Sequence, residues 1–502
     1  MARPQVRQGV FRLSVKSKFQ FTSPLSKRTF QIELSLEFDR NNDRYSSIGN
    51  KMYKIFFVLL VFLVLGGPLK ASAQLRVPPL EIKERTLANG LRVITHRDAS
   101  SPTVAVRVLY DVGGKNDPPG RSGFAHMFEH MMFKSTKNMP NEKMDRLTED
   151  VGGYNNASTW PDFTNYYQVV PSNYLESILW AESDRMVDLN VDEENFASER
   201  DVVKEEYRQG VLANPYGRFF QMLDGLSFQK HPYRRGVIGN LEELDAASRE
   251  DAERFYREFY RPDNAVLFVV GDFEPAQLDR WVDHYFAPIK RPEGTIPRVT
   301  TTEPDWTEER RFEETGPIVP FPAVAITFLA PPSRHPDVPA LQIAESILSD
   351  GESSRLYQAL VRELQIAQQA QFSADIRVDK GLLYFIGVAS EKGTSESMER
   401  ALLAEINKMQ EAPVSAKELE KAKNQLITRA IRQRENNDGR AAIIERAVAY
   451  LGDPNAVNEQ VARLQAVTAE DVQRVMKVYF RDNNRVVIYY NQARSAEGNN
   501  EQ

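Results

Sequence analysis

Hydrophobic residues from about position 80 onward recur with two periods, one typical of strands and one typical of helices. Alternating or continuous apolar runs predict strands at 91–96, 103–111, 155–170, 265–270, 323–329, 368–378, 382–389 and 485–490. Apolar residues three and four positions apart predict helices at 122–136, 172–188, 193–212, 248–260, 337–349, 353–363, 394–410, 415–433, 438–451 and 468–479. The mixture of the two patterns predicts an α+β fold.

The second half of this pattern repeats the first. Residues 248–271 and 468–491, which are 220 positions apart, share the pairs Glu250/Glu470, Asp251/Asp471, Arg254/Arg474, Arg261/Arg481, Asn264/Asn484 and Val266/Val486. Such a repeat predicts one α+β unit used twice, with helices packed on a mixed or antiparallel sheet in each copy. Breaking residues near 288–302 predict a linker. The expected domains are therefore 80–287 and 306–491, joined by 288–305 and followed by a polar tail at 492–502.

The N-terminus carries a pattern typical of a secretory signal. Lys51 and Lys54 flank an unbroken apolar run at 55–65, and Ala71-Ser72-Ala73 has the form of a cleavage site. The run is shorter than the roughly 20 residues that a membrane span requires. We predict a signal peptide at 52–73, a periplasmic or secreted protein, and no stable membrane span after cleavage. An uncleaved anchor is the alternative. Residues 1–51 are interpreted as a non-native or disordered leader, because Met52 can serve as the start.

Composition narrows the chemistry and the partners. The chain of 502 residues contains no cysteine, which excludes disulfides and thiolate metal sites. Residues 74–502 hold 52 Lys and Arg against 66 Asp and Glu, a net charge of −14. This acidity argues against nucleic acid as a partner.

The strongest chemical pattern lies in the predicted helix 122–136, for which Ser122 is a candidate N-cap. His126 and His130 are one helical turn apart, with Glu129 beside them. Two such imidazoles can bind one metal ion, and a neighbouring carboxylate can take a proton from metal-bound water. By itself the H-x-x-E-H string can also arise by chance. A third ligand is available from Glu206, which shares a helical face with Glu199 and lies 76 residues after His130. Val202 and Val203 are expected to anchor that helix.

In combination these motifs resemble the pitrilysin/insulinase family of zinc metallopeptidases, in its half-length, processing-peptidase-like form. Further stretches that resemble the family are 87–91, 152–159, 164–167 and 231–233. The resemblance covers roughly residues 80–490. It implies two related domains around an interior chamber, the LuxS/MPP-like metallopeptidase fold.

The resemblance also implies roles for individual residues. One Zn²⁺ per chain would be bound by His126, His130 and Glu206, with Glu129 as the general base. Glu199 would position a ligand histidine, although a solvated surface charge is the alternative. Asn156, Ala157 and Ser158 would bind an extended peptide substrate, and Arg362 would contact its carbonyl group. The second half would be inactive, because it contains one histidine, His335, and aligns Gln425 with Glu206.

One departure from the family pattern concerns Arg362. Family members place a tyrosine seven residues after this arginine, where the present sequence has Gln368 or Gln369. We therefore predict a partner chain, either a second copy or, preferably, a related chain that supplies the missing pair. The predicted function is a zinc endopeptidase that cleaves peptides or unfolded segments. The alternative is a non-catalytic assembly or binding subunit, and a His₂Glu site also suits other divalent ions.

Overall fold

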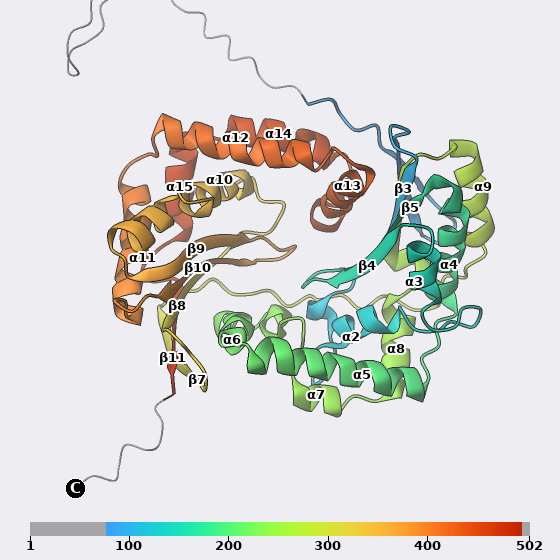
Figure 1. Cartoon of the computed structure of the whole chain (residues 1–502), viewed down its shortest axis with the longest axis horizontal. Helices are drawn as coiled ribbons and strands as arrows, with labels where there is room; N and C mark the ends of the chain where they lie inside the picture. Colours follow the sequence, from blue (N-terminus) through green and yellow to red (C-terminus); the bar gives the residue numbers. More distant parts are fainter. Residues whose placement is uncertain (1–76, 494–502) are drawn as a thin grey trace, which may run out of the picture. The chain divides into compact units, whose positions relative to one another are not determined.

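A computed structural model describes residues 77–493, which form two β-sheets with helices packed against both (Figure 1). The predicted leader, the signal peptide at 52–73 and most of the polar tail lie outside the described residues. Within residues 77–493, no helix combines the length and the apolar character needed to cross a membrane.

The first sheet has six strands in the order β1-β2-β6-β3-β5-β4. Strand β2 pairs with β6 in parallel, and the other neighbouring pairs are antiparallel. This order leaves β4 at one edge, with one side open to a further strand. The strands are β1 (Lys83–Thr86), β2 (Arg92–Arg97), β3 (Thr103–Tyr110), β4 (Tyr154–Thr159), β5 (Thr164–Pro171) and β6 (Ala265–Gly271).

The second sheet repeats five strands of the first. Its order is β7-β11-β8-β10-β9, again with one parallel pair, β7 with β11, followed by antiparallel pairs. The expected α+β fold built from two duplicated units is confirmed, because strand order and strand direction agree in both sheets. The strands are β7 (Arg310–Gly316), β8 (Ala323–Leu329), β9 (Ala367–Asp375), β10 (Leu382–Ala389) and β11 (Arg485–Gln492).

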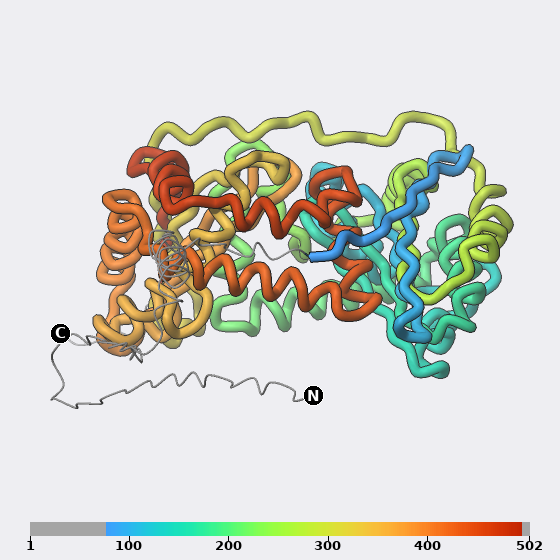
Figure 2. The backbone as a smooth tube through the Cα atoms, turned by 90° about the horizontal axis from the view of Figure 1, so that it is seen from above, coloured from blue at the N-terminus to red at the C-terminus, as the bar shows by residue number. Residues whose placement is uncertain are grey.

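Helices cover both faces of each sheet. Those before the linker are α2 (Phe124–Met131), α3 (Lys143–Glu149), α4 (Leu175–Val187), α5 (Glu193–Tyr207), α6 (Gly217–Ser227), α7 (Leu241–Asp245), α8 (Arg249–Phe259) and α9 (Pro275–Tyr285). Those after it are α10 (Val338–Ser349), α11 (Ser395–Glu411), α12 (Ala416–Arg432), α13 (Asn437–Leu451), α14 (Ala456–Ala466) and α15 (Ala469–Tyr479). The connection between α9 and β7 contains neither helix nor strand and runs as an extended segment (Figure 2).

The two halves exchange one helix each. Helix α13 of the second half packs on the first sheet, where Ile444 lies in one cluster with Ala105 and Phe268. Helix α6 of the first half packs on the second sheet, where Phe219 lies in one cluster with Ala325 and Ile488. Both sheets are therefore buried on two faces, which explains why their central strands are almost continuously apolar.

The predicted elements differ from the structure in two instructive places. Residues 155–170 form two strands, β4 and β5, because the segment 160–163 turns between them. Helix α6 was not predicted, although its apolar residues Phe219, Met222, Leu223 and Leu226 have helical spacing; they pack against the sheet of the other half. Also missed were β1, β7, α3, α7, α9 and α14.

A buried ion-pair cluster fastens α13 to the first sheet. The Arg107 guanidinium on β3 donates to Glu445 at 2.7 Å and to Asp438 at 2.6 Å. The side chains of Arg107 and Glu445 are only 6% and 2% exposed. Asn165 also donates to Glu445, at 2.9 Å. Removal of the arginine would leave a carboxylate buried without its partner.

We expect Arg107→Leu to lower the free energy of unfolding by about 3–5 kcal/mol, the usual result of breaking one side of a buried pair. The double variant Arg107→Leu/Glu445→Leu should recover most of this loss in urea denaturation. As a control, Arg463→Leu removes the exposed pair with Glu459 and should change the free energy by less than about 1 kcal/mol. Equal losses for the two single variants would contradict the assigned role of Arg107.

Candidate metal centre

Helix α2 carries the H-x-x-E-H motif and is capped by a side chain from the loop that precedes it. The Asp117 carboxylate accepts the N–H of Gly123 at 2.6 Å and that of Ala125 at 2.8 Å. Gly123, not Ser122, is the N-cap residue, so the predicted cap is wrong. Its backbone has a φ of 90°, and a Cβ there would lie 2.8 Å from the carbonyl oxygen of Ile238. Both facts require glycine.

The capping role of Asp117 can be measured. We expect Asp117→Ala to lower the free energy of unfolding by about 1–2 kcal/mol, because two N–H groups at the start of α2 lose their acceptor. Ser122→Ala, which removes the side chain that the sequence suggested as a cap, should cost clearly less. Thermal or urea unfolding of both variants checks this expectation, and a larger loss for Ser122→Ala would contradict it.

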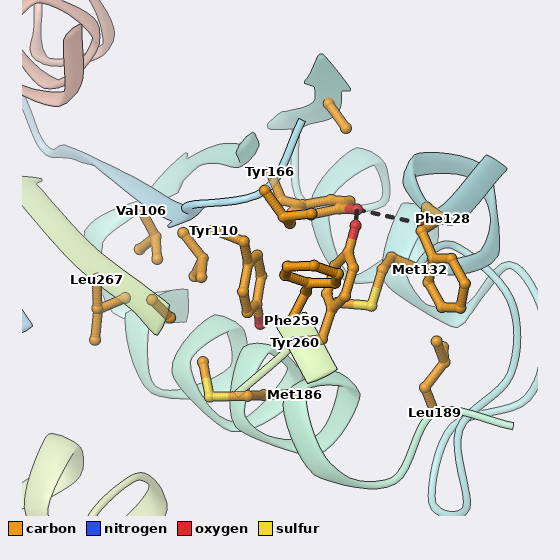
Figure 3. Packing of buried hydrophobic residues seen from close by; sticks show 14 of the residues in the cluster. Val106, Tyr110, Phe128, Met132, Tyr166, Met186, Leu189, Phe259, Tyr260 and Leu267 are labelled. Atoms are coloured by element: carbon orange, nitrogen blue, oxygen red, sulfur yellow. Dashed lines mark hydrogen bonds between the residues drawn. The ribbon is translucent and has the colours of Figure 1, made fainter. Parts of the chain in front are cut away.

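The other side of α2 is held by the core beneath it. Phe128 is fully buried, and its carbonyl oxygen accepts the Tyr166 hydroxyl at 3.2 Å (Figure 3). The same hydroxyl lies 3.1 Å from the hydroxyl of Tyr260. Aromatic packing around Phe128 thus fixes the helix against β5 and α8, and turns His126 and His130 to the opposite face.

The two histidines and Glu206 converge. The Nε2 atoms of His126 and His130 are 3.4 Å apart, and Glu206 Oε2 lies 3.5 Å from each. Among the described residues, these three form a group whose ligand atoms all lie within 4.8 Å of one another. Three ligands at about 2.0–2.1 Å from a tetrahedral zinc ion lie about 3.3 Å apart. The donor set and its spacing therefore fit a zinc ion.

Helix α5 supplies the carboxylates of the centre. Asp192 caps it by accepting the N–H of Asn195 at 2.8 Å. Val203 is fully buried beneath the helix, whereas Val202 is 41% exposed, so the expectation that both valines anchor α5 is wrong for Val202. If α5 were shifted along its axis by one helical turn, Glu206 would move away from the histidines. The anchoring of α5 by Val203 therefore matters for the site.

Glu199 lies behind His130. Its Oε2 atom is 3.6 Å from His130 Nδ1, and its Oε1 atom accepts Lys134 Nζ at 2.7 Å. Although burial opposes the charge, hydrogen bonds with His130 and Lys134 lower the pKa of Glu199. Burial also opposes charge on His130, but the Glu199 hydrogen bond and the nearby carboxylates raise the pKa of that ring. Burial and the neighbouring His130 lower the pKa of His126 to about 4.

Glu129 stands beside the three converging groups. Thr159 at the end of β4 donates its hydroxyl to Glu129 Oε2 at 2.6 Å. Burial raises the pKa of the Glu129 carboxyl, and the Thr159 hydrogen bond acts in the opposite direction. The bond from Thr159 holds the carboxylate in one orientation. No local sequence pattern predicts this role for Thr159.

A cavity of ≈420 Å³ opens at this centre. Strand β4 forms one wall with Ala157, Ser158 and Thr159, and the other lining residues are His126, Glu129, Trp160, Glu206, Val237 and Ile238. Two predicted substrate residues, Ala157 and Ser158, thus reach the cavity, while Asn156 and Arg362 do not line it. Arg362 is exposed on the π-helical turn Tyr357–Glu363, just before β9. Val237 and Ile238 carry no chemical motif and were missed.

The second half preserves the arrangement with different chemistry. Glu345 on α10 accepts the Ser373 hydroxyl of β9 at 3.4 Å, as Glu129 accepts that of Thr159. Ser346 stands where His130 would be and lies 3.3 Å from Gln425, the counterpart of Glu206. A hydroxyl and an amide are poor zinc ligands. At these corresponding positions, the first copy therefore has histidine and carboxylate donors and the second copy does not.

Comparison with known families agrees with the geometry. Residues 92–240 match the family described as Insulinase (Peptidase family M16), and residues 246–426 match the Peptidase M16 inactive domain. The chain belongs to the M16 peptidase family. The inactive-domain match of this M16 chain begins at α8 and covers most of the second half, where the histidine pair is absent.

Relatives of this M16 chain include enzymes. It is 29% identical to the zinc protease PqqE of Helicobacter pylori over 80% of this chain and 91% of the relative. It is 26% identical to a probable mitochondrial-processing peptidase subunit beta of Arabidopsis thaliana over 83% of this chain and 79% of the relative. The crystal structure of a protease from Helicobacter pylori superposes with a TM-score of 0.80 at 27% identity, covering 82% of this chain and all of that chain.

Proposed function

We propose that this M16 chain is a zinc-dependent endopeptidase, secreted or exported to the periplasm, that cleaves peptides or unfolded segments. The observation that carries the proposal is the convergence of His126, His130 and Glu206 at 3.4–3.5 Å, with Glu129 held beside them. In this proposal residues 80–287 form the catalytic unit and residues 306–491 an inactive homologous unit. The predicted signal sequence supports export.

The metal is assigned from the donor atoms. His126, His130 and Glu206 would hold one zinc ion, and bound zinc supplies a Lewis acid that polarises a peptide carbonyl and acidifies water. Glu199 keeps the His130 ring oriented through its contact with Nδ1 at 3.6 Å. Other divalent ions also accept two imidazoles and one carboxylate, so metal analysis is part of the test.

Glu129 performs the proton transfers. It accepts a proton from the attacking water as the carbon–oxygen bond forms, and it donates that proton to the amine nitrogen as the carbon–nitrogen bond breaks. The Thr159 hydroxyl fixes one carboxylate oxygen at 2.6 Å, so the other can face the reacting atoms. Peptide hydrolysis then needs no further acid or base from this chain.

The substrate is proposed to lie along β4. This strand is at the edge of the first sheet, so its open side can pair with an extended peptide through main-chain hydrogen bonds. Asn156, Ala157 and Ser158 belong to this strand, and Ala157 and Ser158 also line the cavity at the metal centre. Such binding selects an extended backbone, which unfolded segments supply and folded proteins do not.

A partner chain remains part of the proposal. Arg362 is exposed, and no tyrosine stands at the position after it where family members have one. A second, related chain would supply an arginine and tyrosine pair to the substrate; a second copy of this chain would not. The alternative function, a non-catalytic assembly or binding subunit, is favoured by this missing tyrosine alone, whereas the complete His126–Glu129–His130–Glu206 set favours the enzyme.

The test is digestion of an unfolded protein and a peptide library by the purified, exported chain. We expect cleavage that a chelator stops and that added zinc restores, with about one zinc ion per chain by metal analysis. Co-expression with a related chain should increase the rate. Zinc binding without cleavage under either condition would support the assembly subunit instead.

A further inference from the structure

A second, larger groove runs along α12 in the other half of the chain. Its volume is ≈1070 Å³, and it extends from the end of α10 to the start of α13. Side chains on one face of α12 form its floor, namely Lys417, Lys421, Asn424, Gln425, Arg429 and Arg432. Apart from two glycines, every residue of the lining has a polar or charged side chain, which suits a charged ligand better than an apolar one.

Positive charge is in excess in this groove. The carboxylate of Asp350 is paired with Arg429 at 3.3 Å, and that of Asp438 is paired with the buried Arg107 at 2.6 Å. Within residues 77–493, the side chains of Lys417 and Arg432 form neither an ion pair nor a hydrogen bond, and Lys421 donates to the neutral Ser353 hydroxyl. Glu420 is the remaining acid of the lining. The lining thus holds four cations against three carboxylates, and this excess of positive charge is available to an incoming anion.

The corresponding positions in the first half carry no positive charge. Under the alignment of Gln425 with Glu206, Lys421 and Asn424 of α12 correspond to Val202 and Glu205 of α5, and Arg432 to Ala213. The cationic side chains of this face are thus absent from the sister helix. Their presence on α12 is not required by the duplicated fold, which points to a role specific to this surface.

Strand β4 connects this groove to the metal centre. Its first residue, Tyr154, donates its hydroxyl to Asp438 in the groove lining at 3.0 Å, while its last residue, Thr159, holds Glu129. Figure 1 shows β4 between α13 and α2. A strand of six residues spans about 16–20 Å at roughly 3.3 Å per residue. A peptide paired with β4 would therefore reach both places at once.

We propose that the α12 groove binds acidic side chains of the peptide substrate. The bound carboxylates lie about five to seven residues from the scissile bond, on the side of the peptide that extends past Tyr154. This inference rests on the proposed function for its substrate, but the groove and its charge are independent of cleavage. It predicts that an acidic residue at this distance improves binding, although the chain as a whole is acidic.

Binding is measured with the full exported chain carrying Glu129→Gln, so that peptides stay intact. The probes are labelled peptides of sixteen residues with one scissile sequence at the centre. Each carries Glu or Gln at one position, from seven residues before the scissile bond to seven after it. Fluorescence anisotropy at low and high salt gives the dissociation constants, and wild-type chain gives kcat/KM for the same peptides.

We expect a glutamate placed five to seven residues from the scissile bond, on one side only, to tighten binding about tenfold relative to glutamine at the same position. Because salt screens exposed ion pairs, the gain from glutamate should be smaller at high salt. Adding the substitutions Lys421→Gln and Arg432→Gln should bring the ratio of the dissociation constants of the Gln and Glu peptides close to one. Lys477→Gln, which removes an exposed charge on α15 outside the groove, should leave this ratio unchanged.

A Glu-to-Gln ratio near one at every position, or an equal loss in the Lys477→Gln control, would overturn the proposal. Absence of measurable binding by the acidic peptides would do the same. If the acidic preference is present in binding but wild-type chain cleaves no peptide, the groove stands and the endopeptidase proposal fails. If wild-type chain cleaves the peptides but no position shows an acidic preference, the endopeptidase proposal stands and the groove proposal fails.

Discussion

Replacing Glu129 by glutamine should leave the zinc content of the chain unchanged and lower kcat for peptide cleavage by about 10³-fold, within the usual range for loss of a general base. Glutamine keeps the volume of the side chain, and its amide oxygen can still accept the Thr159 hydroxyl that now lies 2.6 Å from Glu129. The amide cannot take a proton from water. Metal analysis and a chelator-sensitive peptidase assay on the same preparation measure both parts.

The matched control for this variant is Glu149→Gln. Glu149 ends helix α3, is exposed, and forms no side-chain hydrogen bond or ion pair among residues 77–493. It should leave zinc content and kcat as in the wild type. If Glu129→Gln retains cleavage, another group acts as the base. If it loses zinc together with activity, Glu129 is needed for metal binding and its assigned role is wrong.

Glu206→Ala should weaken zinc binding by more than about 100-fold, because loss of an outer partner of a ligand alone typically costs 10- to 100-fold. The Glu206 oxygen is the third corner of the site, 3.5 Å from both imidazole nitrogens. Two histidines remain after its removal, and they hold zinc less well than three ligands do. Competition with a fluorescent zinc chelator gives the affinity without any need for activity.

The neighbouring Glu205 provides the control on the same helix. Its carboxylate contacts Arg208 and Gln209 on the exposed side of α5, away from the histidines. Glu205→Ala changes the net charge and the helix as Glu206→Ala does, yet it should leave the zinc affinity within about twofold, as expected for an exposed surface change. Equal loss in both variants would show that Glu206 acts through general electrostatics and would remove it from the ligand set.

The sequence singled out the candidate metal ligands because their spacing along helices is a local property. His126 and His130 are one turn apart in any α-helix, and Glu199 and Glu206 share a face for the same reason. Which of the two glutamates faces the Nε2 atoms of both histidines, however, depends on how α5 lies on α2. The tertiary structure placed Glu206 3.5 Å from both Nε2 atoms and Glu199 behind the ring of His130.

Several local expectations failed for one physical reason. Ser122 precedes the helix and suits a cap, but the folded chain brings Asp117 to the same N–H groups. Val202 and Val203 have equal hydrophobicity, yet only Val203 faces the core. In each case the chain offered two candidate side chains, and the folded backbone decided between them, through the path of the loop before α2 and through the face of α5 that meets the core.

The sequence by itself determined the duplication, the α+β class and the candidate ligands, because these follow from periodicity and residue type. The tertiary structure alone decided the exchange of α6 and α13 between the halves, the hold of Thr159 on Glu129, and the link between β4 and the α12 groove. These features join residues separated by 30 to more than 280 positions. Their pairing is fixed by packing and charge in three dimensions, and no local pattern encodes it.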